Sequence, residues 1–208
     1  MAEAPAEAPQ KILVEKTLPY RIARNAVWLW LKLFHRLEVH GGENLPREGA
    51  VMIASNHQSF LDIPIIASAT NRHVCFVARN TLAKFKPLAW LMAKCGTVLI
   101  GRGTADRAAM RLMGEHLSLG DCLAIFPEGT RSKDGTLGQF KGGAVVTARR
   151  AGVPIVPAGI RGPNRVLPSG AWLPRPVKIE IAFGEAIDPA DPEAADKLRA
   201  AVASLIAR

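Results

Sequence analysis

The chain has 208 residues, 49% of them hydrophobic, which suits one domain with a substantial core and excludes a chain that is disordered throughout. Lys and Arg outnumber Asp and Glu by 27 to 18, and this net charge of +9 favours contact with the phosphates of nucleic acid, anionic lipid or a phosphorylated substrate. The three cysteines, Cys75, Cys95 and Cys122, include no C-x-x-C pair, so we expect buried thiols in a reducing compartment.

Residues 1–16 are expected to be a loose tail, because the first ten are rich in Ala, Pro and Glu and lack the pattern of a signal peptide. Residues 17–37 are expected to form an amphipathic helix. Its unbroken apolar run is too short to span a bilayer. Its apolar face is broad, and Trp28 interrupts its narrow polar stripe. The stripe consists of Arg21, Asn25, Lys32 and Arg36. Such a helix lies in a membrane interface, or it packs on the core with its basic stripe in water.

Residues 38–208 are expected to form one α/β domain, because short runs rich in Val and Ile alternate with helical stretches. This alternation predicts a largely parallel central sheet flanked by helices. The expected strands are Ala50–Ala54, His73–Ala78, Thr97–Ile100, Cys122–Phe126, Pro154–Ile160 and Val177–Phe183. The expected helices are Thr81–Lys94, Ala105–Leu119, Gly142–Ala151 and one that starts at Asp191-Pro192. The alternation in Val177–Phe183 favours a half-exposed strand at the edge of the sheet, and Pro163–Pro176 is expected to be a long loop.

The first candidate for chemistry is His57, which directly follows the first expected core strand. The carboxyl ends of parallel strands face the ligand crevice in open α/β sheets, so His57 is expected there. If a short helix follows, the carboxylate of Asp62 reaches one ring nitrogen and leaves the other able to accept a proton. The same His-x4-Asp spacing also occurs in purely structural pairs.

A second polar segment, Phe126 to Ser132, follows another expected strand. Arg131 suits a phosphate, which it can grip through two parallel hydrogen bonds, and Glu128 can accept a bond from a substrate hydroxyl. The alternative is a polar turn with a surface ion pair. Two weaker candidates, Arg102 after an expected strand and Lys141 at the start of an expected helix, add positive charge at the same edge.

Other catalytic patterns are missing from the sequence, including a G-x-S-x-G turn, H-E-x-x-H, a phosphate-binding P-loop and clustered His/Cys metal ligands. The other histidines are dispersed and are expected to be surface or incidental residues. They are His35, His40, His73 and His116. A base with phosphate-binding groups, but with no nucleophile and no metal, points to activation of a substrate hydroxyl.

Four segments occur together in the order and rough spacing of the glycerolipid acyltransferase family, which the chain resembles over about residues 35–190. They are Asn56-His57 with Asp62, Gly96–Arg102, Phe126–Ser132 and Val153–Pro157. The chain looks most like the family's bacterial branch that acts on 1-acyl-glycerol 3-phosphate. The resemblance implies that His57 deprotonates the acceptor hydroxyl and that Asp62 orients it. The acceptor-binding residues implied by it are Arg102, Glu128, Gly129, Thr130, Arg131, Ser132 and Lys141.

The resemblance further implies direct transfer of a fatty acyl group from acyl-CoA or acyl carrier protein to a lysophospholipid, with no metal or other cofactor. It also implies a peripheral or monotopic position on the cytoplasmic face of a membrane with anionic lipid. Gly101 precedes Arg102 where the family often has an acidic or larger residue, so a lyso-ornithine lipid and glycerol 3-phosphate stay open as acceptors. A non-catalytic lipid-binding or nucleic-acid-binding protein is the alternative from another class, but Lys and Arg are not clustered, and we expect no nucleic-acid partner.

Overall fold

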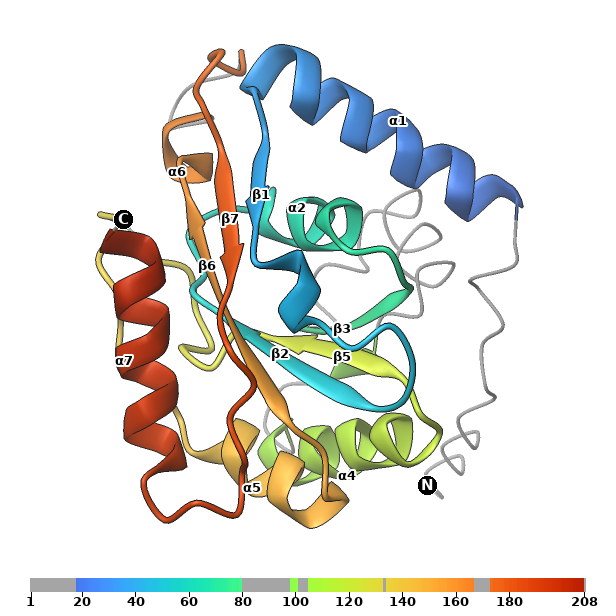
Figure 1. The fold of residues 1–208 in the computed structure, drawn as a ribbon, viewed down its shortest axis with the longest axis vertical. Helices are drawn as coiled ribbons and strands as arrows, with labels where there is room; N and C mark the ends of the chain where they lie inside the picture. The colour runs from blue at the N-terminus through green and yellow to red at the C-terminus, as the bar shows by residue number, and fades with distance from the viewer. Residues whose placement is uncertain (1–17, 80–97, 101–104, 133, 167–172, 208) are drawn as a thin grey trace, which may run out of the picture.

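The computed structural model of the chain describes residues 18–79, 98–100, 105–132, 134–166 and 173–207 (Figure 1). In this part of the chain a seven-stranded sheet has the order β1-β7-β6-β2-β5-β3-β4. Its strands are β1 Glu38–His40, β2 Val51–Ser55, β3 Val74–Arg79, β4 Val98–Ile100, β5 Cys122–Ile125, β6 Ile155–Arg161 and β7 Glu180–Phe183. Every neighbouring pair is parallel except β6 with β7. The prediction of a largely parallel sheet is confirmed.

Helices cover both faces of this sheet. The helices are α1 Leu18–His35, α2 Asp62–Ala69, α4 Ala105–Ser118, α5 Gly143–Ala151, α6 Pro163–Val166 and α7 Ala194–Ala207, with the short 3-10 helix η2 Gly42–Asn44. On one face Leu31 of α1 and Ile65 of α2 pack against Ile53 and Phe76 of the sheet. On the other face α4, α5 and α7 enclose a second cluster around Met52. The two clusters make one α/β sandwich.

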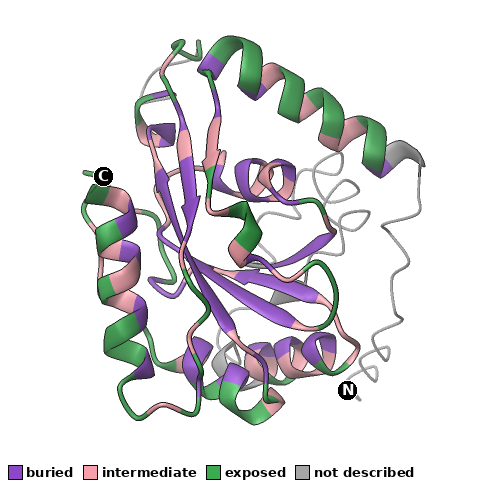
Figure 2. Ribbon diagram, viewed as in Figure 1, coloured by how far each residue is buried: buried purple, intermediate pink, exposed green. Residues whose placement is uncertain are grey.

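The centre of the sheet is the most deeply buried part of the described structure (Figure 2). All five residues of β2 are buried, and so are six of the seven residues of β6. A strand covered on both faces needs apolar residues at successive positions rather than in alternation, which is why β2 reads Val-Met-Ile-Ala. The sheet is therefore a rigid support for the loops that leave its carboxyl edge.

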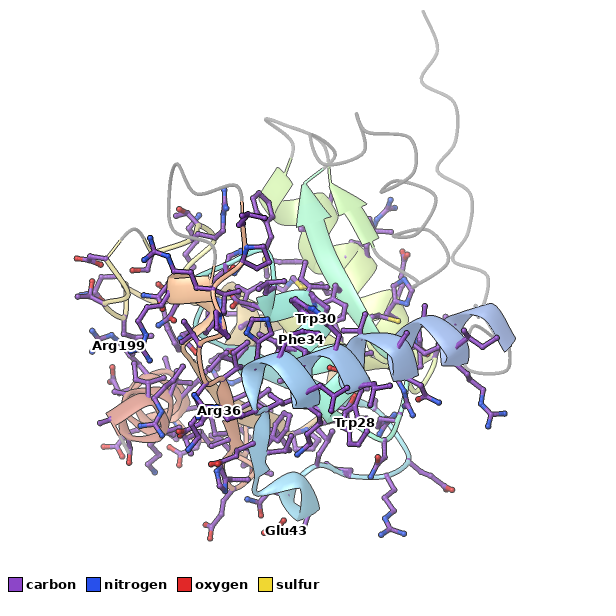
Figure 3. All side chains as sticks on the ribbon, turned by 90° about the horizontal axis from the view of Figure 1, so that it is seen from above. Trp28, Trp30, Phe34, Arg36, Glu43 and Arg199 are labelled. Atoms are coloured by element: carbon purple, nitrogen blue, oxygen red, sulfur yellow. The ribbon has the colours of Figure 1, made fainter. Side chains whose placement is uncertain are left out.

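Helix α1 has two different apolar faces. Tyr20 and Leu31 are buried against the domain, and α1 packs on α2. A second set of large apolar side chains is exposed, which is Ile22, Trp28, Leu29, Leu33 and Phe34. Figure 3 shows Trp28 on the opposite side of the helix from Trp30 and Phe34, so the exposed side chains Trp28 and Phe34 lie on two sides of α1 rather than on one face. The broad apolar face expected from the sequence is therefore divided between the core and the surface.

Several predicted boundaries need correction. Helix α1 ends at His35 rather than near residue 37, because Arg36 takes a left-handed conformation with φ 47° and the Leu37 amide turns back to the Leu31 carbonyl at 3.1 Å. The last helix begins at Ala194, because Asp191 accepts the Glu193 amide in a turn before it. The expected helix Thr81–Lys94 lies outside the described residues.

The prediction that Val177–Phe183 lies at the sheet edge is wrong. The strand begins only at Glu180 and lies between β1 and β6, because the unpredicted strand β1 pairs with it from Glu38↔Glu180 to His40↔Ala182. Within the expected loop Pro163–Pro176, residues 163–166 form α6. The three-residue strand β1 thus covers the edge of β7, which would otherwise be exposed.

The prediction that the histidines other than His57 are surface residues holds only for His40. His35, His73 and His116 are buried. The His35 ring contacts the Val177 carbonyl at 3.1 Å and meets the Trp30 ring edge-on, so it joins α1 to the sheet. Among the described residues, no helix combines the length and the hydrophobicity needed to cross a membrane.

Candidate active site

His57 leaves the sheet at the carboxyl end of β2, where the preceding residue anchors the chain. The buried Asn56 side chain donates to the Ile160 carbonyl at 2.9 Å and accepts from the Ile160 amide at 2.8 Å. This pair of bonds copies the pattern of a strand pair and ties β2 to β6 beyond the last paired residue. The position of His57 is therefore set by the most buried part of the sheet.

The imidazole of His57 is oriented by a buried carboxylate. Asp62 is 0% exposed, and its Oδ2 lies 2.7 Å from His57 Nδ1 while it accepts the backbone amides of Gln58 at 2.6 Å and Ser59 at 2.8 Å. Two of these donors are amides, so the oxygen acts as an acceptor and Nδ1 carries the proton. The other ring nitrogen, Nε2, then has a lone pair, as a general base requires.

The phenyl ring of Phe126 also restrains the imidazole of His57, in a direction that the Asp62 bond does not. The rings of Phe126 and His57 stack with centroids 4.0 Å apart and an interplanar angle of 14°. Phe126 follows β5, the neighbour of β2 in the sheet. The Asp62 bond restricts rotation in the plane of the ring, and the stack restricts tilting out of it.

Replacing Phe126 with Leu is expected to lower kcat by roughly tenfold with little change in KM for the acceptor, because the imidazole loses one of its two restraints while the pocket residues stay. Steady-state kinetics on Phe126→Leu and on Phe140→Leu, a pocket phenylalanine that does not stack on His57, measure this split. An increase in KM at unchanged kcat would show that Phe126 contacts the acceptor instead.

Glu128 connects the segment after β5 to the backbone of His57 after β2. Its Oε1 accepts the His57 amide at 2.8 Å and its Oε2 accepts the Gly138 amide at 3.0 Å, and the residue is buried. The Ser132 amide donates to the His57 carbonyl at 2.8 Å, so the segment after β5 holds both backbone polar groups of His57. Glu128 was expected to bind the acceptor, but both of its oxygens already bind the scaffold.

An open pocket of about 510 Å³ begins at these residues and is lined by two cationic side chains, Arg131 and Lys141. The Arg131 guanidinium lies over the Phe60 ring, 3.8 Å from its centroid. The Lys141 amino group extends across Gly129, 3.2 Å from where a Cβ would lie, and Gly129 has φ 70°, so a side chain there would be strained and crowded. The pocket offers two cations and a backbone surface without a side chain between them.

The pocket is also lined by two carboxylates, Glu128 and Asp134. Asp134 accepts hydrogen bonds from the hydroxyl and the amide of Thr136 and from the Ser132 hydroxyl. These bonds, that of the Thr136 hydroxyl first, lower the pKa of Asp134 to about 2. Asp134 is therefore ionised at neutral pH and holds the Ser132 side chain in the turn that closes the pocket.

The structure brings together most of the residues predicted from the sequence. His57 and Asp62 form one pair, and the pocket contains Glu128, Thr130, Arg131, Ser132 and Lys141, with Gly129 against Lys141. Arg102 lies outside the described residues. The reasoning from sequence missed the stack of Phe126, the anchor at Asn56 and the contact of Phe60 with Arg131; only the position of Asn56 and Phe126 directly after strands could have indicated the first two.

An oriented imidazole beside a cation-lined pocket, at the carboxyl edge of a parallel sheet, suits proton removal from the hydroxyl of an anionic substrate. The family model described as Acyltransferase matches residues 36–161. The 1-acyl-sn-glycerophosphate (LPA) acyltransferase PlsC from Thermotoga maritima has a similar structure, with a TM-score of 0.73 and 30% identity, and the match covers 90% of this chain and 78% of that one. The chain belongs to the acyltransferase family.

Two curated relatives differ in the acceptor that their names give. The chloroplastic 1-acyl-sn-glycerol-3-phosphate acyltransferase BAT2 of Brassica napus is 34% identical over 150 residues, which are 69% of this chain and 43% of the relative. The lyso-ornithine lipid O-acyltransferase of Pseudomonas aeruginosa is 33% identical over 124 residues, 59% of this chain and 47% of the relative. The chain spans less than half the length of either relative.

Proposed function

We propose that the protein transfers a fatty acyl group from acyl-CoA or acyl carrier protein to the sn-2 hydroxyl of 1-acyl-glycerol 3-phosphate, giving phosphatidic acid. The observation that carries this proposal is the His57–Asp62 pair, whose backbone is bonded to residues that line a pocket with Arg131 and Lys141. A phosphate beside the hydroxyl would be held by these two cations. The names of the Brassica and Thermotoga proteins support the same acceptor.

The chemistry follows from the geometry of the pair. Nε2 of His57 takes the proton of the acceptor hydroxyl as its oxygen attacks the thioester carbonyl, and Asp62 stabilises the imidazolium that forms. The tetrahedral intermediate collapses with cleavage of the carbon–sulfur bond, and the imidazolium returns the proton to the departing thiolate. The ester and the thiol leave with His57 as it was at the start, so one base serves both halves of the reaction.

An acceptor panel tests the proposal and identifies the headgroup. Purified protein in mixed micelles is supplied with acyl-CoA or acyl carrier protein and with lysophosphatidic acid, glycerol 3-phosphate or lyso-ornithine lipid. Arg131→Gln is expected to raise KM for lysophosphatidic acid about tenfold or more, since a charged hydrogen bond to phosphate is lost. Arg150→Gln, which removes an exposed charge at the end of α5, is the matched control and is expected to leave KM unchanged.

Each result of the panel assigns one function. Turnover restricted to lyso-ornithine lipid would show that the acceptor is an ornithine lipid rather than a lysophosphatidic acid, as the name of the Pseudomonas relative gives. No turnover with any donor and acceptor, from folded protein that binds lipid vesicles, would contradict an enzymatic role and favour a lipid-binding protein. Equal effects of Arg131→Gln and Arg150→Gln on KM would show that Arg131 does not bind the acceptor.

We also propose that the exposed apolar face of α1 lies in the interface of an anionic membrane and places the pocket beside the lipid. Leu33 is 68% exposed and Leu29 is 51% exposed, with Lys32 and Arg36 beside them. Apolar side chains of this size favour the acyl boundary, and the basic residues favour anionic headgroups. Helix α1 packs on α2, whose first residue is Asp62, so the surface is close in structure to the candidate base.

Leu33→Asp is expected to weaken binding to vesicles that contain anionic lipid by about tenfold or more, because it removes an exposed leucine that the membrane would bury and adds a charge of the same sign as the lipid. Sedimentation with vesicles at constant salt measures the binding. Val146→Asp, which makes the same charge change at an exposed position of α5, is the control. Equal binding of Leu33→Asp and the native chain would show that the membrane surface lies elsewhere.

A further inference from the structure

The chain contains a second pair with the His-x4-Asp spacing, at His116 and Asp121. His116 Nδ1 lies 2.8 Å from Asp121 Oδ2, nearly the same separation as in the pair of His57. His116 is in the last turn of α4, and Asp121 directly precedes β5, so this pair lies at the amino edge of the parallel sheet. The proposed acyl transfer takes place at the opposite edge and does not use it.

A thiol and a third histidine lie beside this second pair. Cys75 is the second residue of β3 and packs in the same cluster as Met113 and Leu117 of α4. His73, which directly precedes β3, places its Nδ1 3.8 Å from Cys75 Sγ. One ligand atom from each of Cys75, His116 and Asp121 lies within 4.8 Å of the other two.

We propose that Cys75, His116 and Asp121 bind a divalent transition-metal ion of the zinc type and leave its fourth position open to solvent. Thiolate, imidazole and carboxylate are the three ligand types that zinc takes in proteins. Ligand atoms on a tetrahedral zinc ion are about 3.3–3.7 Å apart, so a cluster whose ligand atoms lie within 4.8 Å of one another needs to close by about 1.5 Å at most.

The surroundings would hold an ion away from bulk water. Cys75 and His116 are 2% and 6% exposed, and the charge of the bound cation would compensate that of the Cys75 thiolate and the Asp121 carboxylate. The Asp121 side chain is 20% exposed, which gives an ion a path from solvent. A bound ion would join the start of β3, the end of α4 and the start of β5.

The other cluster of possible ligands in the described residues does not support a metal site. Glu38, His40 and Glu180 lie on β1 and β7, but the Lys178 amino group is 2.9 Å from a carboxylate oxygen of each glutamate. Its hydrogen bonds lower the pKa of both glutamates, so a cation of the protein's own already occupies the position. Beside the cluster around Cys75, the nearby Arg72 guanidinium donates to the backbone carbonyls of Pro46, Gly49 and Gly120, and no ion pair between it and Asp121 is found among the described residues.

Titration with cobalt(II) tests the proposal, because a cobalt–thiolate bond gives a charge-transfer band and a tetrahedral site gives intense visible bands. The full chain is stripped with chelator and titrated with cobalt(II), and the bound ion is then displaced with zinc. We expect one ion per chain, and bands that Cys75→Ala abolishes. Asp121→Asn is expected to weaken binding by about 10–100-fold.

The chain offers matched thiol controls. Cys122 pairs beside Val74, and Cys75 beside Leu123, so Cys122 points to the opposite face of the sheet. Cys122→Ala and Cys95→Ala are expected to keep the cobalt bands, and so is His57→Ala. Zinc at about 100 times its dissociation constant is expected to raise Tm by roughly 5–10 °C in the native chain and not in Cys75→Ala.

The proposal would be overturned by absence of saturable cobalt binding, by bands that persist in Cys75→Ala, or by bands that disappear only in Cys95→Ala. If Cys75→Ala does not fold, Asp121→Asn decides, since its side chain is partly exposed and asparagine keeps its shape. Equal cobalt affinity of Asp121→Asn and the native chain would then refute the site. None of these readouts depends on acyl transfer, so failure of the proposed function would not mimic them.

Discussion

His57→Ala is expected to lower kcat for acyl transfer by about 10²–10⁴-fold, the usual contribution of a positioned general base. The substitution removes the imidazole that is held by Asp62 on one side and by Phe126 on the other, with a lone pair left at Nε2. Steady-state kinetics on the acceptor chosen by the panel measure the change. Acceptor KM should change little, since Arg131 and Lys141 are untouched.

The loss should be chemical rather than structural. Asp62 keeps the amides of Gln58 and Ser59 when the imidazole is removed, so we expect the free energy of unfolding to fall by only about 1 kcal/mol. His40→Ala, which removes an exposed histidine on β1, is the matched control and should retain native kinetics. Retention of most of the activity in His57→Ala would refute the proposed base.

Glu128→Ala is expected to damage both stability and turnover. The carboxylate accepts two backbone amides, those of His57 and Gly138, in a buried position, and alanine leaves both without an acceptor. At about 1–3 kcal/mol for each such group, the free energy of unfolding should fall by about 2–6 kcal/mol. Denaturant unfolding measures this fall, and kcat should drop because the His57 backbone loses its link to the pocket.

Glu128→Gln separates this structural role from direct binding of the acceptor. Its amide oxygen satisfies one of the two amides, while its NH₂ group faces the other, so its stability should lie between those of the native chain and Glu128→Ala. If Glu128 acted mainly on the acceptor hydroxyl, as expected from the sequence, Glu128→Ala would raise KM and leave the free energy of unfolding nearly unchanged. That result would contradict the structural role.

The place of the candidate site could be predicted from the sequence because it depends on local rules. His57 and Phe126 each follow a run of buried apolar residues, and successive parallel strands bring their carboxyl ends to the same edge. The reach of Asp62 to His57 is also local, since a tight turn brings residues five apart within hydrogen-bonding distance. The bonds of Glu128 to His57 and Gly138 could not be predicted, because they need the exact spacing of β2 and β5.

The predictions that the structure corrects, on the position of β7 and on the burial of the histidines, depend on contacts between distant segments. Strand β7 was placed at the edge of the sheet because its own residues alternate, but its position depends on β1, about 140 residues earlier in the chain. The burial of His35, His73 and His116, which the sequence predicts to be surface or incidental residues, has the same cause. His35 contacts Val177, and His73 meets Tyr20 edge-on with ring centroids 5.0 Å apart. These contacts join segments whose distance in the sequence gives no sign of their proximity.

The two His-x4-Asp pairs show which properties of a site follow from the sequence and which follow only from the tertiary structure. The sequence by itself determined that each histidine can reach its carboxylate, and the separations of 2.7 and 2.8 Å are nearly the same. Only the tertiary structure decided that His57 lies beside the cation-lined pocket and His116 beside a buried thiol at the other edge of the sheet. Spacing along the chain limits what neighbouring residues can reach, whereas the surroundings of a pair are built by strands and helices that the chain brings together from far apart.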